Sequence, residues 1–327
     1  MTSRLEHGAL ATVFGGSGFV GRYAVRGLAK QGMRVRAAVR RPDLAGHLQP
    51  MGAVGQIHPV QANVRYPDSV NAAVAGADVV INFVAILTPS GRQTYDAVHV
   101  KGARAVAKAA RESGVKQFIH ISALGADLKS PSKYGRSKAL GEQAVLEEFP
   151  DALILRPSIV FGPEDEFYNR FAGLAQSAPF LPLIGGGRSK FQPVYAGDLA
   201  TAVLSAAGGA AQPGSIYEIG GPEVLTFRQI LDTVCDWTDR KRMYIPMPFW
   251  VAKLQALLTW PLPNALRPIT LDQVRMLQVD NVVSDAAVSE GRTIAALGVS
   301  HPQAAGVIVP AYLERYRPRG QFSHYRG

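Results

Sequence analysis

The first candidates for chemistry are a tyrosine and a lysine in the segment Tyr134-Gly135-Arg136-Ser137-Lys138. Four residues apart on a helix, the two side chains share one face. A lysine cation stabilises a nearby phenolate and lowers the pKa of tyrosine from about 10 toward working pH, which equips Tyr134 for acid–base catalysis. Taken alone, this spacing more often describes two surface residues. Its meaning therefore depends on the surrounding elements.

A glycine-rich loop lies near the N-terminus, between an apolar run and a helical stretch. Gly15 permits a tight turn, Gly18 lets backbone N–H groups approach a pyrophosphate, and Gly21 lets the helix pack closely on the strand. The phosphates would lie at the positive end of that helix. The predicted cofactor-binding residues here are Gly15, Gly16, Ser17, Gly18, Phe19, Val20 and Gly21.

The second predicted strand ends about 20 residues further on, in Val39-Arg40-Arg41. An NAD site places a carboxylate there for the ribose 2′-hydroxyl, whereas Arg40 and Arg41 offer guanidinium groups to a 2′-phosphate. We therefore expect the cofactor to be NADPH (NADP) rather than NAD(H).

Later strand ends supply the other candidates. Asn63-Val64 would lie against the adenine and Val84-Ala85 beside its ribose, although Asn63 could equally bond its own loop. Tyr134 and Lys138 would reach the nicotinamide ribose. The remaining predicted cofactor-binding residues are Ser122, Ala123, Pro157, Ser158 and Ile159.

Short apolar runs alternate with helical stretches to about residue 205, as in β-α-β units around a parallel sheet. Strands are predicted at 9–14, 34–39, 56–60, 79–84, 117–122 and 152–156, with Ala-rich helices at 101–113 and 137–149. We predict an α/β fold, a Rossmann-type doubly wound parallel sheet in 1–160 with a strand returning near 190–205. A smaller, interleaved C-terminal α/β domain is expected in 161–327.

The motifs together resemble the extended short-chain dehydrogenase/reductase superfamily. The resemblance covers the glycine loop, the Tyr134/Lys138 pair, residues 155–163 and residues 193–200. Active members carry a Ser or Thr just past the fifth strand that polarises the substrate carbonyl. Here that position holds Ala123, and Ser122 lies one residue short, on the other face of an extended strand. The resemblance therefore implies an incomplete catalytic triad.

Within that superfamily, residues 118–122, 161–172 and 190–195 resemble the NAD(P)H-binding accessory subunits of respiratory complex I. The resemblance implies a structural nucleotide and other complex I subunits as partners. It also implies a peripheral location at the inner membrane, on the cytoplasmic side in a bacterium or the matrix side in a mitochondrion. Tyr134 and Lys138 would then be vestigial.

Two other functions fit the same residues. One is a free-standing NADPH-dependent reductase or nucleotide-sugar epimerase using Tyr134 and Lys138. The other is a regulatory protein that binds a partner according to NADPH occupancy. Co-purification with flavin and iron–sulfur subunits would favour the complex I assignment over both.

The net charge of +10 belongs to the first half, because residues 1–150 carry 19 basic and 10 acidic groups and residues 151–327 carry 16 and 15. Seven cations and no acidic residue lie between Arg22 and Arg41. A solvated helix face, an anionic lipid surface and an acidic protein partner all remain open. No nucleic acid is expected, since zinc-finger, RNP and basic-zipper patterns are lacking.

Other features exclude further classes. No apolar run reaches the roughly 18 residues of a spanning helix, and the glycine loop begins too early for a removable leader to be expected. The single cysteine, Cys235, lies in an apolar-periodic stretch and is expected to be a packed thiol in a reducing compartment. The scattered histidines predict no metal site.

The segment 246–263 is the most apolar stretch of the second half, with Trp250 and Trp260 near its ends and Lys253 as its one charge. It suits an interfacial helix or a partner groove, and it equally suits a core helix of the small domain. The basic tail 312–327 is expected to form an arm on an acidic neighbour or to be disordered.

Overall fold

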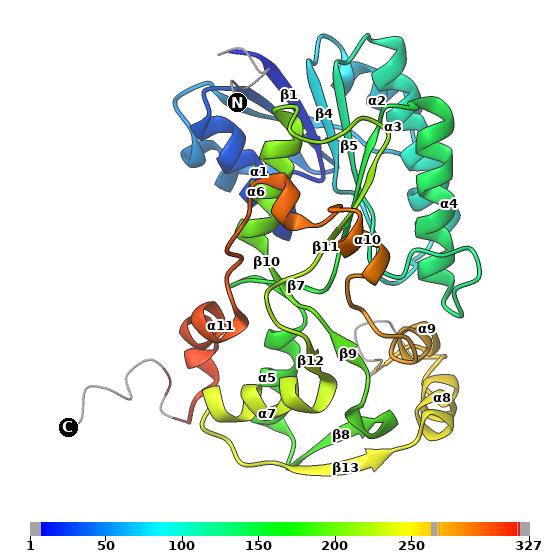
Figure 1. Ribbon diagram of the computed structural model, residues 1–327, viewed down its shortest axis with the longest axis vertical. Helices are drawn as coiled ribbons and strands as arrows, with labels where there is room; N and C mark the ends of the chain where they lie inside the picture. The colour runs from blue at the N-terminus through cyan, green and yellow to red at the C-terminus, as the bar shows by residue number, and fades with distance from the viewer. Residues whose placement is uncertain (1–7, 263–266, 268, 319, 321–327) are drawn as a thin grey trace, which may run out of the picture. The chain divides into compact units, whose positions relative to one another are not determined.

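The computed structural model describes residues 8–262, 267, 269–318 and 320 (Figure 1). The chain forms two compact units. The first takes the described residues up to Pro157, then Ala196–Ile219 and Val283–His301, and the second takes Ser158–Tyr195, Gly220–Val282 and the described residues from Pro302. A strand was expected to return to the first unit near 190–205. That prediction is wrong, because the chain returns there as the helix α6 (Ala196–Ala207), and the strand that joins the sheet is β11 (Ile216–Ile219). The first unit also gains residues 283–301.

A seven-stranded parallel sheet forms the centre of the first unit, in the order β3-β2-β1-β4-β5-β6-β11. Its strand order reverses direction between β1 and β4, which is the switch point of a Rossmann fold. The predicted fold class is confirmed, and the six predicted strands occur within two residues of their expected ends. The strands are β1 Leu10–Phe14, β2 Arg34–Val39, β3 Ile57–Gln61, β4 Val79–Asn82, β5 Gln117–Ile121, β6 Leu153–Pro157 and β11 Ile216–Ile219.

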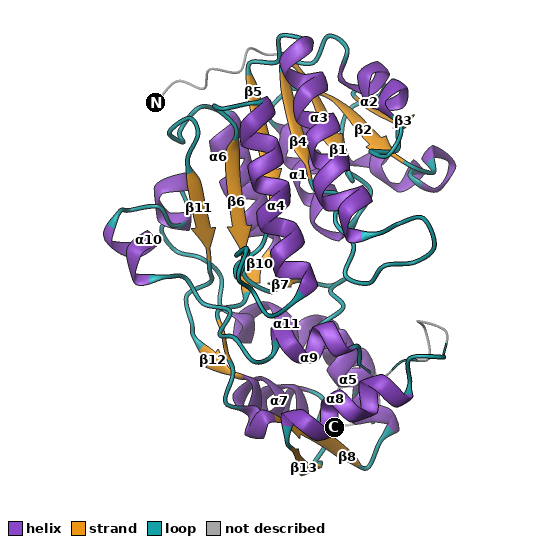
Figure 2. Cartoon of the chain, turned by 90° about the vertical axis from the view of Figure 1, so that its right-hand side faces the viewer, coloured by secondary structure: helices purple, strands orange, loops and turns teal. Residues whose placement is uncertain are grey.

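Helices cover both faces of this sheet (Figure 2). On one face α1 (Phe19–Lys30) packs against α6 (Ala196–Ala207); on the other α3 (Lys101–Glu112) packs between α2 (Pro67–Val74) and α4 (Lys133–Glu148). Because both faces are covered, the central strands are apolar runs, and all four residues of β4 are buried. Short helical segments are Pro42–Leu44, Gly46–Met51, a π turn at Asp96–Val100, α10 (Asp285–Ser289) and Ile294–Leu297.

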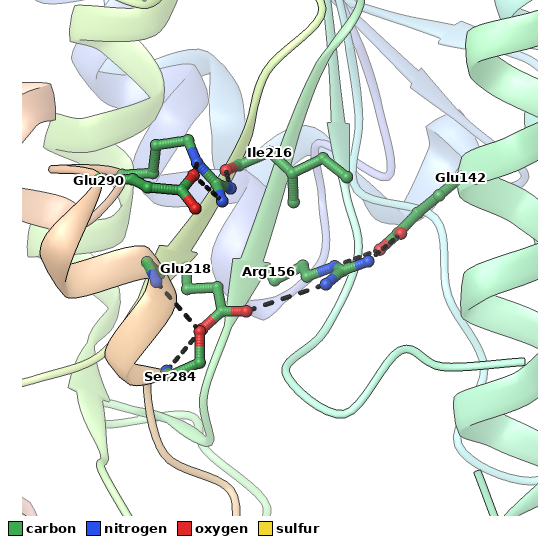
Figure 3. Close-up of polar contacts among 8 residues, drawn as sticks. Glu142, Arg156, Ile216, Glu218, Ser284 and Glu290 are labelled. Carbon is green, nitrogen blue, oxygen red and sulfur yellow. Dashed lines mark hydrogen bonds and ion pairs between the residues drawn. The ribbon is translucent and has the colours of Figure 1, made fainter. Parts of the chain in front are cut away.

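An ionic network holds the late segments in the first unit (Figure 3). Arg156 of β6 forms two hydrogen bonds, 2.9 and 2.6 Å, to Glu142 of α4, and lies 3.8 Å from a carboxylate oxygen of Glu218 in β11. Glu218 also accepts from the backbone N–H of Ser284 at 2.7 Å. One guanidinium thereby links a helix, two strands and the segment that begins at residue 283.

The second unit contains three two-stranded pairs, β7–β10, β9–β12 and β8–β13, and an aromatic core. Phe161, Tyr168, Phe191 and Phe227 are buried in it. The strands are β7 Val160–Phe161, β8 Phe180–Ile184, β9 Lys190–Phe191, β10 Val194–Tyr195, β12 Leu225–Thr226 and β13 Met243–Met247. The helices are α5 Tyr168–Ser177, α7 Phe227–Trp237, α8 Phe249–Leu258, α9 Leu271–Met276 and α11 Ala305–Leu313, followed by a short turn at Glu314–Tyr316.

The start of the expected C-terminal arm is packed within this unit. Leu313 is buried, Tyr312 donates a hydrogen bond to the Asp165 carboxylate, and Arg317 Nε donates to the carbonyl of Trp237 at 2.9 Å. The prediction of an arm from residue 312 is therefore wrong for 312–317, because aromatic and arginine side chains there find partners on α5 and α7. Arg319 and residues 321–327 lie outside the described residues.

Candidate functional site

The glycine loop joins β1 to α1 at the carboxyl edge of the sheet. Gly15, at φ +75°, donates from its N–H to Ala38 of β2 at 3.0 Å. A Cβ at Gly21 would lie 2.2 Å from the Gly15 carbonyl oxygen, so α1 rests directly on the turn. Only glycine permits this approach. These are the contacts for which the sequence spacing required Gly15 and Gly21.

The N-terminus of α1 is suited to an anion. Gly18 is its N-cap, so no side chain caps the helix, and its first turn contains no acidic residue. The first N–H groups of such a helix point outward with positive partial charge. Gly18 itself is exposed, while Gly16 and Gly21 are buried and Ser17, Phe19 and Val20 are half-buried. The loop thus leaves its exposed side open to a phosphate.

Arg22 adds a cation that the sequence analysis did not single out. Its Nη2 donates to the Ser17 carbonyl and its Nε to the Gly18 carbonyl, both at 3.3 Å. Because long side chains on a helix point back toward its N-terminus, an arginine on the first turn falls beside the loop. That rule could have identified it from the sequence.

The two arginines that follow β2 have different partners. Arg41 is paired with Asp43, with Nη2 to Oδ2 at 2.8 Å and two further hydrogen bonds from Nε. Arg40 donates from Nη1 to the amide oxygen of Gln93 at 2.5 Å. The guanidinium of Arg41 is paired with a carboxylate, whereas that of Arg40 bonds only to a neutral amide. Arg40 is therefore the better placed of the two to bind a phosphate.

Of the cofactor-binding residues predicted after β3 and β4, some lie beside the glycine loop and others do not. Val84 is brought to the loop, because a Cβ at Gly15 would lie 3.5 Å from its Cγ2, and the adjacent Ala85 is exposed. Asn63 instead accepts a hydrogen bond in its own loop, from the N–H of Arg65 at 3.2 Å. Val64 is buried against α3, where a Cβ at Gly102 would lie 2.8 Å from it. Asn63 therefore adopts the loop role that the sequence analysis left open.

Tyr134 and Lys138 share one face of α4, one helical turn apart, and burial changes the pKa of both. Lys138 is buried and its Nζ donates to the carbonyl of Ile121 at 2.7 Å. Burial raises the pKa of Tyr134 to about 12 and lowers the pKa of Lys138 to about 8. The predicted lowering of the Tyr134 pKa is wrong in this structure, because burial disfavours the charged phenolate and raises the pKa.

His99 is a residue of this region that sequence reasoning missed. It lies in the π turn before α3, and its ring centroid is 5.5 Å from that of Tyr134. Its Nε2 accepts from the N–H of Ile86 at 3.0 Å, and its Nδ1 lies 2.8 Å from Ser137 Oγ, which donates to the Tyr134 carbonyl. Burial lowers the pKa of His99 to about 3. A neutral imidazole therefore supports the start of α4.

The segment after β5 holds buried polar atoms. Ser122 and His120 point to the same face of the sheet, and their Oγ and Nε2 atoms have no protein partner among the described residues. Asn82 of β4 lies 3.3 Å from the other nitrogen of His120. Ala123, at the position where active relatives carry a hydroxyl, is half-buried.

The last three predicted cofactor-binding residues belong to different units. Pro157 ends β6 in the first unit, where its carbonyl accepts from the N–H of Leu124 at 2.9 Å. Ser158 and Ile159 belong to the second unit, where both bond to Oδ1 of Asn281, at 2.7 and 3.1 Å. Their role in cofactor binding stays a prediction.

Helix α8 of the second unit presents a strongly apolar surface. It buries only Ala252 and Ala256, whereas Trp250 is 68% exposed, Leu258 73% and the following Trp260 67%. Arg267 stacks over the Trp260 ring at 5.2 Å. Most of the segment is therefore surface, and the core-helix alternative holds for the two alanines and for the half-buried Met247 and Phe249, which pack against the small buried cluster that includes Ala252. None of the described helices is long and apolar enough to cross a membrane.

The fold and loop are those of an extended short-chain dehydrogenase/reductase, and a model of the NAD dependent epimerase/dehydratase family matches residues 11–220. The chain is 38% identical over 292 residues to NADH dehydrogenase (ubiquinone) 1 alpha subcomplex subunit 9 of Arabidopsis thaliana, covering 86% of this chain and 72% of the relative. For the Mus musculus subunit the identity is 34%, over 84% and 73%. The chain therefore belongs to the family of these mitochondrial complex I subunits, which confirms the resemblance found in its motifs.

Among solved structures, an NADPH-dependent quinone oxidoreductase of Escherichia coli crystallised with NADPH has a TM-score of 0.71. It is 21% identical, and the match covers 93% of this chain and 99% of that one. This similarity concerns the fold alone.

Proposed function

We propose that this protein is an accessory subunit of a respiratory complex I that holds NADPH as a structural and assembly cofactor. The proposal that the protein does not catalyse a reaction rests on the surroundings of Tyr134. Ala123 stands at the position where active relatives carry a hydroxyl, Lys138 donates to the carbonyl of Ile121, and burial raises the pKa of the Tyr134 phenol to about 12. A general acid works best with a pKa near the operating pH, which Tyr134 does not have.

Nucleotide binding is supported by the glycine loop and the residues around it. The uncapped N-terminus of α1 and the exposed Gly18 fit a pyrophosphate, and Arg40 fits a 2′-phosphate. Val84 would line the adenosine end beside Gly15. When bound, the dinucleotide would add stability that rises with the logarithm of its concentration above the dissociation constant, because it binds only the folded chain.

The proposed partners are other subunits of complex I, on the cytoplasmic or matrix side of the inner membrane. We further propose that α8 and Trp260 contact the membrane surface, since exposed tryptophans and leucines beside Lys253 and Arg267 suit the interface of an anionic bilayer. Flotation with anionic vesicles tests this: the chain should bind, and Trp250→Ser with Leu258→Ser should abolish binding. Equal binding by the double variant would refute a role for this surface.

The central test is co-purification. The tagged chain, expressed in its own cells and extracted from membranes with mild detergent, should elute with flavin- and iron–sulfur-containing subunits and with bound NADPH. A chain that elutes alone and oxidises NADPH with a carbonyl substrate would instead be a free-standing reductase.

A further inference from the structure

The segment 84–95, which follows β4, connects the residues proposed to hold the adenosine end of the cofactor. It begins at Val84 beside Gly15. The carbonyl of Arg92 accepts a hydrogen bond from Arg65 Nη1 at 3.2 Å, and the side chain of Gln93 reaches Arg40. The segment thus passes from the glycine loop to the end of β2.

The position of Gln93 is fixed by a tight turn. Ser90 and Gln93 exchange two backbone hydrogen bonds, 3.0 and 2.9 Å long, across Gly91, whose φ is +52°. The side chain of Gln93 is half-buried and its amide oxygen is 2.5 Å from Arg40 Nη1. The contact is therefore part of an ordered turn.

A neutral amide is a weak partner for a guanidinium. Hydrogen bonds from arginine to a phosphate are charge-assisted and are roughly twice as strong as bonds to neutral acceptors. A 2′-phosphate would therefore displace Gln93 from Arg40, whereas a dinucleotide with a free 2′-hydroxyl carries no charge to compete for Arg40. The neighbouring Arg41 is less suited to such an exchange, because the carboxylate of Asp43 already forms charge-assisted hydrogen bonds with it.

We propose that Gln93 is a specificity-determining residue, which occupies Arg40 until a 2′-phosphate replaces it. The amide lowers the affinity for NADPH by the strength of one hydrogen bond and leaves the affinity for NADH unaltered. This inference rests on the proposed NADPH binding, and it assigns to the turn at 90–93 a part in cofactor choice that its sequence does not reveal.

The test is isothermal titration of the full chain with NADPH and with NADH. Gln93→Ala should bind NADPH about threefold to tenfold more tightly, the equivalent of one net hydrogen bond, with NADH affinity changed less than about twofold. Gln93→Glu should weaken NADPH binding by about tenfold or more, because a carboxylate competes for Arg40 and repels the phosphate. Gln49→Ala, an exposed amide elsewhere in the first unit, is the matched control and should have no effect.

A double-mutant cycle assigns the effect to Arg40. In an Arg40→Ala background, Gln93→Ala should no longer tighten NADPH binding. Unchanged or weaker NADPH binding by the single variant Gln93→Ala would overturn the role of Gln93, while a wild-type preference for NADPH would leave the proposed function standing. A wild-type chain that binds neither dinucleotide would refute the proposed function, and this inference with it.

Discussion

His99 contacts two parts of the fold at once: Ile86 in the segment after β4, and both Ser137 and the ring of Tyr134 on α4. Since its Nε2 accepts a backbone hydrogen bond, the folded protein requires a neutral ring. Protonation would turn that acceptor into a donor facing another donor. Burial is the main cause of the fall in the pKa of His99 to about 3, and the positive charge of Lys138 adds to it.

A pH dependence of stability follows from this. The pKa of His99 in the folded chain lies below its ordinary value of 6.5, so below about pH 6.5 the unfolded chain binds the extra proton. Stability is full above pH 6.5 and falls as the pH drops toward 3. Between pH 7.5 and 5.0 the loss is about 2 kcal/mol.

We predict that His99→Gln removes about this much of the acid-induced loss, measured as the free energy of urea unfolding at pH 7.5 and 5.0. The exposed His58 provides the control, since His58→Gln makes the same chemical change at the surface. An identical loss of stability in wild type and His99→Gln would contradict a neutral, buried His99.

Because α1 packs directly on the glycine loop, Gly21 and Gly18 differ in how much space a larger side chain would have. A Cβ at Gly21 meets backbone at 2.2 Å, whereas a Cβ at Gly18 comes no closer than 3.2 Å to the Gly15 oxygen. Gly21→Ala should therefore destabilise the nucleotide-free chain by about 3 kcal/mol, because helix and loop must separate.

Gly18→Val should destabilise the nucleotide-free chain by only about 1 kcal/mol, since it mainly worsens an N-cap. It should nevertheless abolish stabilisation by NADPH, about 4 kcal/mol for wild type at a thousandfold excess over the dissociation constant, by filling the space of the pyrophosphate. Thermal unfolding with and without NADPH measures both effects. A wild-type melting curve indifferent to NADPH would contradict a structural role for the nucleotide.

The network around Arg156 predicts that the stability it contributes depends mainly on the pair Arg156–Glu142. Glu142 has a side chain only 5% exposed, so Arg156→Met leaves a buried carboxylate without its cation, at a cost of about 3 kcal/mol or more. Adding Glu142→Gln should restore part of the stability, because the uncompensated charge is gone. Additive losses in the double variant, determined by urea unfolding, would show that the pair is not coupled.

The sequence predicted the elements that follow local rules and missed those that depend on distant partners. Apolar runs and glycine spacing located β1 to β6 and the loop. Strand β11 has only four residues, and segment 283–301 joins the first unit through Glu218 and Ile216 across more than 60 residues of sequence. Periodicity carries no information about such pairing.

The candidate site shows the same division. Arg40 and Val84 were predicted from strand ends, and the loop from its glycines. The pairing of Arg41 with Asp43, the contact from Gln93 and the placement of His99 depend on side-chain geometry that spacing does not encode. The pKa of Tyr134 was predicted in the wrong direction, because the sequence shows a nearby cation and does not show the burial that raises the pKa.

At the scale of the whole molecule, the two units carry different parts of the proposal. The first holds the glycine loop, Arg40 and Tyr134, and the second presents the apolar surface of α8. In the proposed role, the bound nucleotide would contribute stability and the apolar surface would contribute attachment.

The most direct measurement is NADH-driven quinone reduction in membranes from a strain carrying Tyr134→Phe, with bound NADPH quantified in the same preparation. A phenol that transferred a proton would contribute a factor of about 10² to 10⁴. A structural phenol contributes one hydrogen bond to the binding of NADPH, about 1 kcal/mol, and no step to the transfer of electrons. We predict turnover within about twofold of wild type and retained NADPH. A strain that keeps its NADPH but loses most of its turnover would contradict the structural role and make this protein an enzyme.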